Sequence, residues 1–254
     1  MIKKHLLTCS VMLVLVVISS LFICGKTVTK TVKAVPAKLP RTSYIFERSE
    51  APNDFSFADE AIPVNDDLIN RRLQYSLMKH NHRVIQSNIL QEKAEKLFPI
   101  IEPILKAYGI PDDFKYIPLV ESGLKEGTSY RGAAGLWQFM PGTARTFGLR
   151  VNRNRDERMN VQKSTVAACK YIRDLYSEFN SWTLAAAAYN IGSIKLQKAI
   201  NRQSEDNYFR MHFNHETGTY VYKLIAMKEI IEKPTEYGYK YYYHPQLEDL
   251  IVYN

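Results

Sequence analysis

The sequence predicts a mainly α-helical fold. Apolar residues recur three and four positions apart, the period of one helix face, in three segments: Leu97, Ile101, Ile104 and Tyr108; Cys169, Ile172, Tyr176 and Phe179; Tyr220, Leu224, Met227 and Ile231. A fourth segment, SWTLAAAAYNIG, is alanine-rich and lies between a serine and a glycine, which favour helix starts and ends. Strand-like alternation is scarce before the Tyr-rich C-terminal stretch.

The chain has 254 residues, of which 46% are hydrophobic and 24% charged, enough for one core domain with appendages. Its formal net charge of +8 favours polyanionic surroundings. No run of lysine and arginine is interleaved with aromatic residues, so we do not expect nucleic acid as a partner.

Residues 1–25 are expected to be a signal peptide or membrane anchor. MIKKHLL is basic, and VMLVLVVI forms an apolar core. The body should therefore be exported. LFICG loosely resembles a lipoprotein box with Cys24 as the lipidated residue. Because the bulky Phe22 and Ile23 stand where small residues are usual, an anchor or cleaved signal is preferred.

The rest of the chain divides by composition. Residues 26–75 are predicted to form a flexible tether, first basic and then acidic. Residues 76–233 should form the helical domain, and residues 234–254 a Tyr-rich tail packed on it. Cys169 is the single cysteine of the body, so we expect a small buried hydrophobic side chain rather than a disulfide.

Local signals predict where helices begin, end or bend. Pro99 and Pro103 should kink or break the first helix. Asp112 or Asp113 can cap the next one, and Ser164 or Thr165 the one after it.

The last two helices have clearer limits. The alanine-rich helix should start near Ser181 and stop near Gly192, and the final helix should end at Pro234.

Glu121 interrupts an apolar run in IPLVESGL. In a helix it would share a face with Phe114 and Ile117 and lie in the last turn before Gly123, after a bend at Pro118. Burial and the helix dipole would both raise the pKa of its carboxyl group, as a general acid requires. On local spacing alone, a glutamate that faces solvent or pairs with a lysine remains an alternative.

Two further segments carry polar groups next to small residues. In GAAGLWQFMPGTA, glycines allow close approach of a ligand to the backbone, and Gln138 offers a donor and an acceptor for sugar hydroxyl or acetamido groups. Trp137 and Phe139 belong either to the core or to a cleft. Tyr189 and Asn190 follow four alanines at a helix end and suggest the wall of a site.

Taken in order and spacing, ESG, GAAGLWQFMPGTA, AYNIG and ETGTYV resemble the transglycosylase SLT domain, in particular that of the membrane-bound lytic murein transglycosylases of the D type. The resemblance covers residues 76–233. It implies a lysozyme-like fold with a substrate cleft and a peptidoglycan substrate. It further implies non-hydrolytic cleavage of the β-1,4 bond between N-acetylmuramic acid and N-acetylglucosamine, which leaves 1,6-anhydromuramoyl ends.

The resemblance also assigns roles to single residues. It implies Glu121 as the catalytic acid/base and five substrate-binding positions: Ser122, Gln138, Tyr189, Asn190 and Tyr220. Gly218 stands where relatives often have arginine. The implied partners are peptidoglycan strands and, through the N-terminal segment, the membrane, in the periplasm. No protein partner is indicated.

No cofactor or metal is expected. HFNHE places two histidines and a glutamate together, but a zinc site would need a further ligand from elsewhere.

A single acid is enough when the substrate's own acetamido group assists. Glu126, Asp112 and Asp113 are candidates for a second carboxylate, and nothing in the sequence fixes one of them across a cleft. A goose-type lysozyme-like hydrolase, which needs that carboxylate to orient water, therefore remains an alternative. So does a non-catalytic peptidoglycan-binding module, which would have no use for an acid at residue 121.

Overall fold

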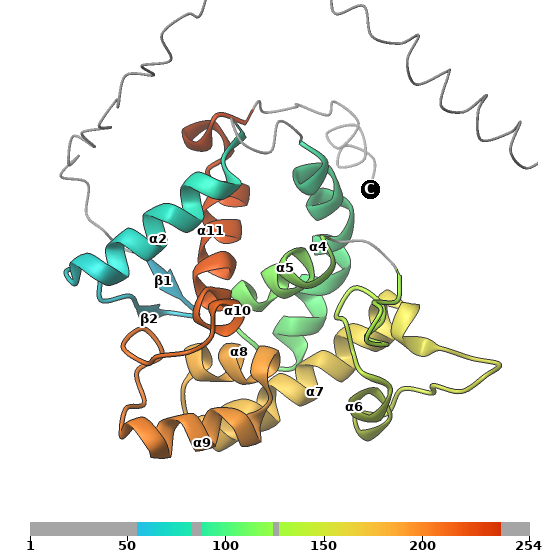
Figure 1. Cartoon of the computed structure of the whole chain (residues 1–254). Coiled ribbons are helices and arrows are strands. Elements are labelled where there is room, and N and C mark those ends of the chain that lie inside the picture. Colours follow the sequence, from blue (N-terminus) through green and yellow to red (C-terminus); the bar gives the residue numbers. More distant parts are fainter. Residues whose placement is uncertain (1–54, 83–87, 124–126, 240–254) are drawn as a thin grey trace, which may run out of the picture. The chain divides into compact units, whose positions relative to one another are not determined.

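The computed structural model describes residues 55–82, 88–123 and 127–239, all within one compact unit, residues 51–254 (Figure 1). The longer helices are α2 (Asp67–His80), α4 (Ile89–Ala107), α7 (Val161–Phe179), α8 (Trp182–Ile191), α9 (Ser193–Gln203) and α11 (Tyr220–Glu232). The short ones are η1 (Asp112–Tyr116), α5 (Ile117–Ser122), α6 (Pro141–Thr146), η2 (Glu157–Met159), α10 (His215–Gly218) and η3 (Pro234–Tyr237). Strands β1 (Ser56–Phe57) and β2 (Glu60–Ala61) pair antiparallel. The mainly helical prediction is confirmed for the described residues.

Helix α8 forms the centre of the core. Its four successive alanines, residues 185–188, are fully buried, and the helix packs against α7, α9 and α11. Small side chains let neighbouring helices approach closely. The alanine run therefore indicates both that the segment is helical and that it lies at the centre of the fold. The expected limits are confirmed: Ser181 is the N-cap and Gly192 the C-cap.

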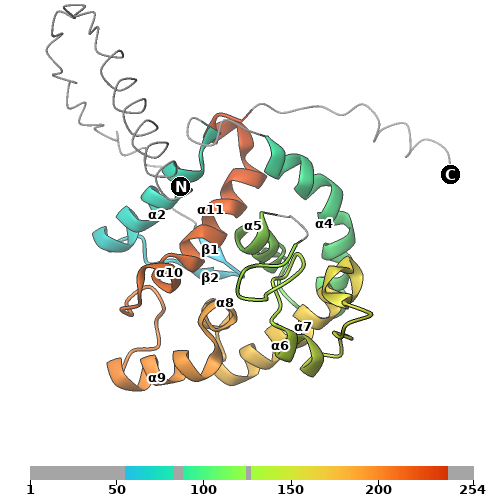
Figure 2. The same ribbon diagram turned by 45° about the vertical axis from the view of Figure 1, so that its right-hand side comes forward.

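Helix α11 is the second central element. It packs against α2 along its length and also against α5, α8 and η1. Both views show α2 lying beside α11 (Figures 1 and 2). Nine of its thirteen residues are buried, because other elements cover it on several sides. The expected helix end is confirmed, since α11 stops at Glu232 and Pro234 opens η3.

Two carboxylates, one buried and one half-buried, join the N-terminal hairpin to the helices. Asp113 Oδ2 accepts hydrogen bonds from the backbone N–H of Ala58, at 2.7 Å, and from Lys228 Nζ, at 2.8 Å. The carboxylate of Glu60 in β2 accepts from Ser181 Oγ and from the free N–H groups of the first turn of α8. These two carboxylates therefore hold β1 and β2 against α11 and α8.

The capping predictions at two helices are wrong. Pro111 precedes η1 without a side-chain cap, while Asp113 is used in the tertiary contact described above. Helix α7 begins four or five residues earlier than expected and is capped by Asn160, which accepts from the backbone N–H of Lys163. Ser164 and Thr165 instead lie inside α7 and donate to backbone carbonyls of the preceding turn.

Two further expectations need correction. Of the predicted kink or break in α4, the break does not occur, since the helix continues through both Pro99 and Pro103. The tether predicted for residues 26–75 does not include residues 55–75: Phe57 and Leu73 are fully buried, and α2 starts at Asp67 after the N-cap Asp66. Residues 1–54, which contain the predicted signal or anchor and Cys24, lie outside the described residues.

Other expectations are confirmed where they can be followed. Cys169 is fully buried, and burial raises the pKa of its thiol to about 12. Tyr239, in the predicted tail, is buried and donates a hydrogen bond to the carbonyl of His80, whereas residues 240–254 are not described. Within the described ranges, no helix is both long and apolar enough to cross a membrane.

The Asp113 contact gives a stability prediction. Asp113→Asn should lower the free energy of unfolding by about 3 kcal/mol, because it leaves the largely buried Lys228 ammonium without its counter-charge. Asp112→Asn is the matched control: its carboxylate is 57% exposed and should contribute no more than about 1 kcal/mol. Chemical denaturation measures both, and equal losses would contradict the assigned role of Asp113.

Candidate active site

Glu121 lies in the last turn of α5, as predicted, but the secondary structure that precedes it differs from the prediction. The chain passes from η1 into α5 without one continuous helix, and Pro118 stands in the first turn of α5, where its missing N–H costs nothing. Gly123, at φ 59°, adopts the left-handed conformation and ends the helix. The predicted bend before Glu121 is thus replaced by a new helix start.

The carboxylate of Glu121 is paired with a buried tyrosine. Tyr220, at the start of α11, donates from its hydroxyl to Glu121 Oε1 over 2.7 Å, and only 2% of Tyr220 is exposed. The alternatives of a glutamate in open solvent or in a lysine ion pair are wrong, since the half-buried Glu121 has this tyrosine as its direct partner.

The surroundings favour the neutral form of Glu121. Burial is the main cause that raises the pKa of its carboxyl group above the ordinary 4.5, and the nearby charge of Glu216 acts in the same direction. The Tyr220 hydrogen bond and the positive charge of Lys223 lower the pKa and partly offset this effect. The predicted direction of the shift is confirmed, although the neighbouring carboxylate is a cause that local spacing could not reveal.

Tyr189 completes the set of polar groups around Glu121. Its hydroxyl, near the end of α8, donates to the backbone carbonyl of Trp137 at 2.7 Å. Burial, followed by the charge of Glu121, raises the pKa of both Tyr189 and Tyr220 well above 10. Both phenols therefore remain neutral hydrogen-bond donors while they lie within electrostatic reach of the glutamate.

The glycine-rich segment forms a tight turn against η2. A Cβ atom on Gly135 would lie 1.9 Å from the backbone oxygen of Arg158, and Gly135 has a φ of +76°. The buried Arg158 guanidinium donates to the carbonyls of Gly132 and Phe139 and is itself held by Asp156. Sequence reasoning missed Arg158, whose partners lie 19 and 26 residues away and follow no local pattern.

Gln138 is placed on this turn in a left-handed conformation, with φ 47°. Its Nε2 donates to the carbonyl of Gly135 at 2.8 Å. Trp137 is fully buried and donates from Nε1 to Thr165, and Phe139 is buried beside it. The core alternative is therefore confirmed for both aromatic residues.

The two remaining predicted residues lie at helix ends. Asn190 Oδ1 accepts a hydrogen bond from Thr217 Oγ1 at 3.1 Å, which links the end of α8 to α10. Ser122 Oγ donates to the carbonyl of Pro118 within α5. The structure thus brings Glu121, Tyr220 and Tyr189 together, whereas the side chain of Ser122 is turned onto its own helix.

The proposed second carboxylates are engaged elsewhere or lie outside the described residues. Asp112 pairs with Lys115 and Asp113 with Lys228, and Glu126 is not described. Glu216, in α10, is the carboxylate whose charge acts on Glu121. In the described ranges, no three His, Cys, Asp or Glu side chains are grouped as a metal site would require, and HFNHE is no exception.

The part of the chain that holds ESG, GAAGLWQFMPGTA and AYNIG is similar to a known family. Residues 99–211 match the family described as "Transglycosylase SLT domain", so the predicted resemblance is confirmed. More particularly, the chain is 32% identical over 183 residues to "Membrane-bound lytic murein transglycosylase D" of Escherichia coli (strain K12), a match that covers 70% of this chain and 39% of the relative. The chain thus spans about two fifths of that relative's length.

Two other similarities were found. A "Putative tributyltin chloride resistance protein" of Alteromonas sp. (strain M-1) is 31% identical over 111 residues, which cover 43% of this chain and 54% of that protein. Among solved structures, the 70 kDa soluble lytic transglycosylase SLT70 from Escherichia coli gives a TM-score of 0.45 at 20% identity, covering 68% of this chain and 32% of the other.

The turn at Gly135 gives a second prediction. Gly135→Ala should destabilise the protein by more than about 3 kcal/mol, because the new methyl group would collide with the Arg158 backbone. Gly132→Ala is the matched control: its φ is also positive, at +86°, but a Cβ there meets open space, so only about 1–2 kcal/mol of backbone strain is expected. Denaturant midpoints compare the two, and similar losses would contradict the close approach.

The raised pKa of Glu121 gives a third prediction. Above the ordinary pKa of 4.5 the folded protein holds a proton that the unfolded chain releases, so wild-type stability falls as pH rises through the folded-state pKa. Glu121→Gln lacks this titration and should gain stability relative to wild type over that window. Thermal unfolding across pH measures the difference. Below pH 4.5 the two proteins should differ least, and a difference that does not depend on pH would exclude the shift.

Proposed function

We propose that this protein is a lytic transglycosylase that cleaves the β-1,4 bond between N-acetylmuramic acid and N-acetylglucosamine in peptidoglycan and leaves 1,6-anhydromuramoyl ends. The observation that carries the proposal is the pairing of a partly desolvated Glu121 with the buried Tyr220 hydroxyl, inside a domain that matches the SLT family. The name of the E. coli relative, a membrane-bound lytic murein transglycosylase, supports the same reaction.

In the first step Glu121 acts as a general acid. Its raised pKa keeps the carboxyl group protonated to higher pH than an exposed glutamate, as proton donation to a glycosidic oxygen requires. Because Tyr220 donates to Oε1, that oxygen must accept, and the acidic proton resides on Oε2. The tyrosine therefore directs which oxygen faces the scissile bond.

In the second step the same group acts as a base. The 2-acetamido oxygen of the muramoyl residue stabilises the anomeric carbon as the glycosidic bond breaks. The Glu121 carboxylate then takes the proton of the muramoyl 6-hydroxyl, whose oxygen closes the anhydro ring. The Tyr220 hydrogen bond and the charge of Lys223, which both lower the Glu121 pKa, stabilise the carboxylate between the two steps.

The other residues position the glycan. Gln138 Oε1 receives no hydrogen bond from the described residues, and it can accept one from a sugar hydroxyl. Asn190 uses Oδ1 for Thr217, which leaves its NH₂ group to donate to an acetamido oxygen. Tyr189 and Ser122 complete the proposed binding wall. Such fixed groups act by orientation more than by chemistry.

The substrate places the protein in the bacterial cell envelope. A basic and then apolar N-terminal segment would carry the chain across the inner membrane into the periplasm and attach it there. The relative described as membrane-bound supports that attachment. The positive net charge suits a polymer whose peptide stems carry carboxylates.

A hydrolase of the goose-type lysozyme class is the second candidate, and Glu216 is the observation that favours it. This exposed residue is the carboxylate whose charge reaches Glu121, so it could orient an attacking water. Its exposure to solvent argues for the first candidate, because a group that orients one water molecule is usually fixed by neighbours.

Digestion of purified sacculi tests the proposal. Glu121→Gln should lower the rate of cleavage at least about a hundredfold, since an amide cannot donate the proton. Glu216→Gln is the matched control, with the same change in charge, and should retain activity. Mass spectrometry of the muropeptides should find products lighter by one water than those of a hydrolase.

The outcomes separate the two candidates. Appreciable lysis by Glu121→Gln would refute Glu121 as the acid. Reducing-end products, together with loss of activity in Glu216→Gln, would establish the hydrolase instead.

A further inference from the structure

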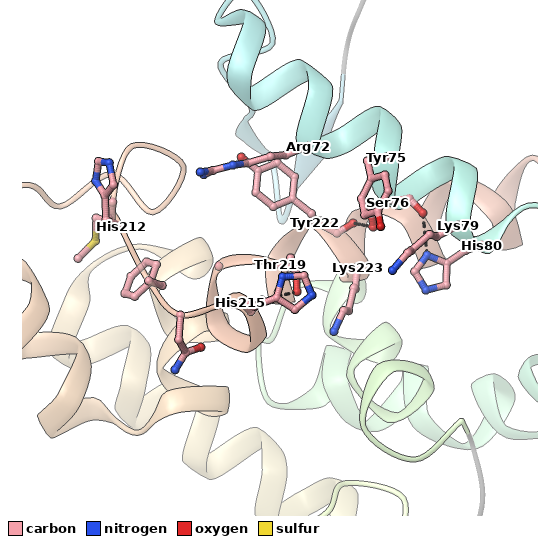
Figure 3. A pocket seen from close by; sticks show the side chains of 14 residues that line it. Arg72, Tyr75, Ser76, Lys79, His80, His212, His215, Thr219, Tyr222 and Lys223 are labelled. Atoms are coloured by element: carbon pink, nitrogen blue, oxygen red, sulfur yellow. Dashed lines mark hydrogen bonds between the residues drawn. The ribbon is translucent and has the colours of Figure 1, made fainter. Parts of the chain in front are cut away.

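A basic pocket lies between α2 and the segment that leads into α11. It has a volume of about 390 Å³, in the range of small-ligand sites. Six basic side chains line it, and no aspartate or glutamate does: Arg72, Lys79, His80, His212, His215 and Lys223. Figure 3 shows the α2 side chains on one side of this pocket and those of α10 and α11 on the other.

The cationic side chains of the pocket form no direct ion pair among the described residues. Within the described part of the chain, Arg72, Lys79 and Lys223 form no ion pair with a carboxylate, whereas Lys115, Lys163 and Lys228 all do. Burial lowers the pKa of His80, and the charges of Lys223 and Lys79 lower it further. Two ammonium groups therefore act on one imidazole, a repulsive arrangement that an anion would relieve.

The buried hydroxyl of Tyr222 lines the pocket beside the Arg72 guanidinium. Only 1% of Tyr222 is exposed, and its hydroxyl forms no hydrogen bond of standard geometry with the described residues, although the Arg72 guanidinium is close enough to lower its pKa. The ring of Phe213 also lines the pocket, so apolar surface accompanies the charge.

The pocket adjoins the candidate active site through α11. Tyr220, which binds Glu121, is followed within one turn by Tyr222 and Lys223, which line the pocket. The charge of Lys223 acts on both Glu121 and His80, so this lysine lies between the two sites. A substituent on a sugar held at Glu121 can therefore extend into the pocket.

We propose that this pocket binds the carboxylates of the peptide stem attached to the muramoyl residue next to the scissile bond, and so positions the strand. The inference rests on the proposed function. Three cations without a direct ion pair match an acidic peptide, and the aromatic lining matches its aliphatic side chains. The concave, partly open pocket suits a short branch of the polymer better than a flat membrane surface. Arg72, Lys79 and Lys223 are positioning residues in this scheme.

The test compares glycan strands that carry peptide stems with strands whose stems an amidase has removed. The double variant Arg72→Gln/Lys79→Gln should raise KM for stem-bearing strands about tenfold, with kcat unchanged, for the loss of about 1.4 kcal/mol of charge-assisted binding. On stem-free strands, variant and wild type should have the same kcat/KM. A merely structural role would impair both substrates.

The matched control is Arg71→Gln/Lys198→Gln. It removes the same charge from exposed residues that do not line the pocket, one of them on α2. It should leave KM for both strands as in wild type. An equal rise in KM in the control, or an equal loss on both kinds of strand, would overturn the proposal.

A binding measurement separates this inference from the proposed reaction. Calorimetry with the otherwise intact Glu121→Gln protein uses a free stem peptide and the same peptide with its carboxylates amidated. Binding of the acidic peptide alone, and its loss in the double variant, supports the pocket even if no strand is cleaved. Equal binding of both peptides, or binding only to anionic lipid vesicles, refutes it even if the cleavage reaction is established.

Discussion

The hydrogen bond between Tyr220 and Glu121 is the contact on which the candidate site depends, because it joins residues 99 positions apart. It forms only if the end of α5 and the start of α11 meet. The position of α5 follows from η1, and η1 is fixed by Asp113, which holds both β1 and Lys228 of α11. A structural ion pair therefore sets the geometry of the Glu121–Tyr220 pair in the candidate site. Glu121, whose burial costs free energy, thus lies a few residues from Asp113, whose ion pair stabilises the surrounding structure.

Much of the helical framework could be predicted because its causes are local. A repeat of three and four residues follows directly from helix geometry, and Ser181, Gly192 and Gly123 act within one turn of their own position. The direction of the Glu121 pKa shift was also predictable, because the apolar residues on the same helix face indicate that this face is buried. The ordered motifs then gave the SLT resemblance, which the family match over residues 99–211 confirms.

The remainder depends on partners distant in sequence. Asp113 looks like a cap from its neighbours alone, yet its partners lie 55 and 115 residues away. Arg158 carries no signal that marks it as the support of the Gly135 turn. The segment 55–75 reads as a tether because two two-residue strands are too short to show a period, although Phe57 is fully buried. In each case long-range packing, rather than local preference, decides the role of the residue.

The place of α2 against α11 bears on how this domain can be isolated for study. The family match ends at residue 211, before Tyr220, and begins after α2. A fragment cut at those limits would lose the tyrosine that holds the acid and the helix that covers α11. The part of the chain that packs into one hydrophobic core is therefore longer than residues 99–211, which match the family model. Expression boundaries should follow the buried side chains from Phe55 to Tyr239, not the limits of the motif region.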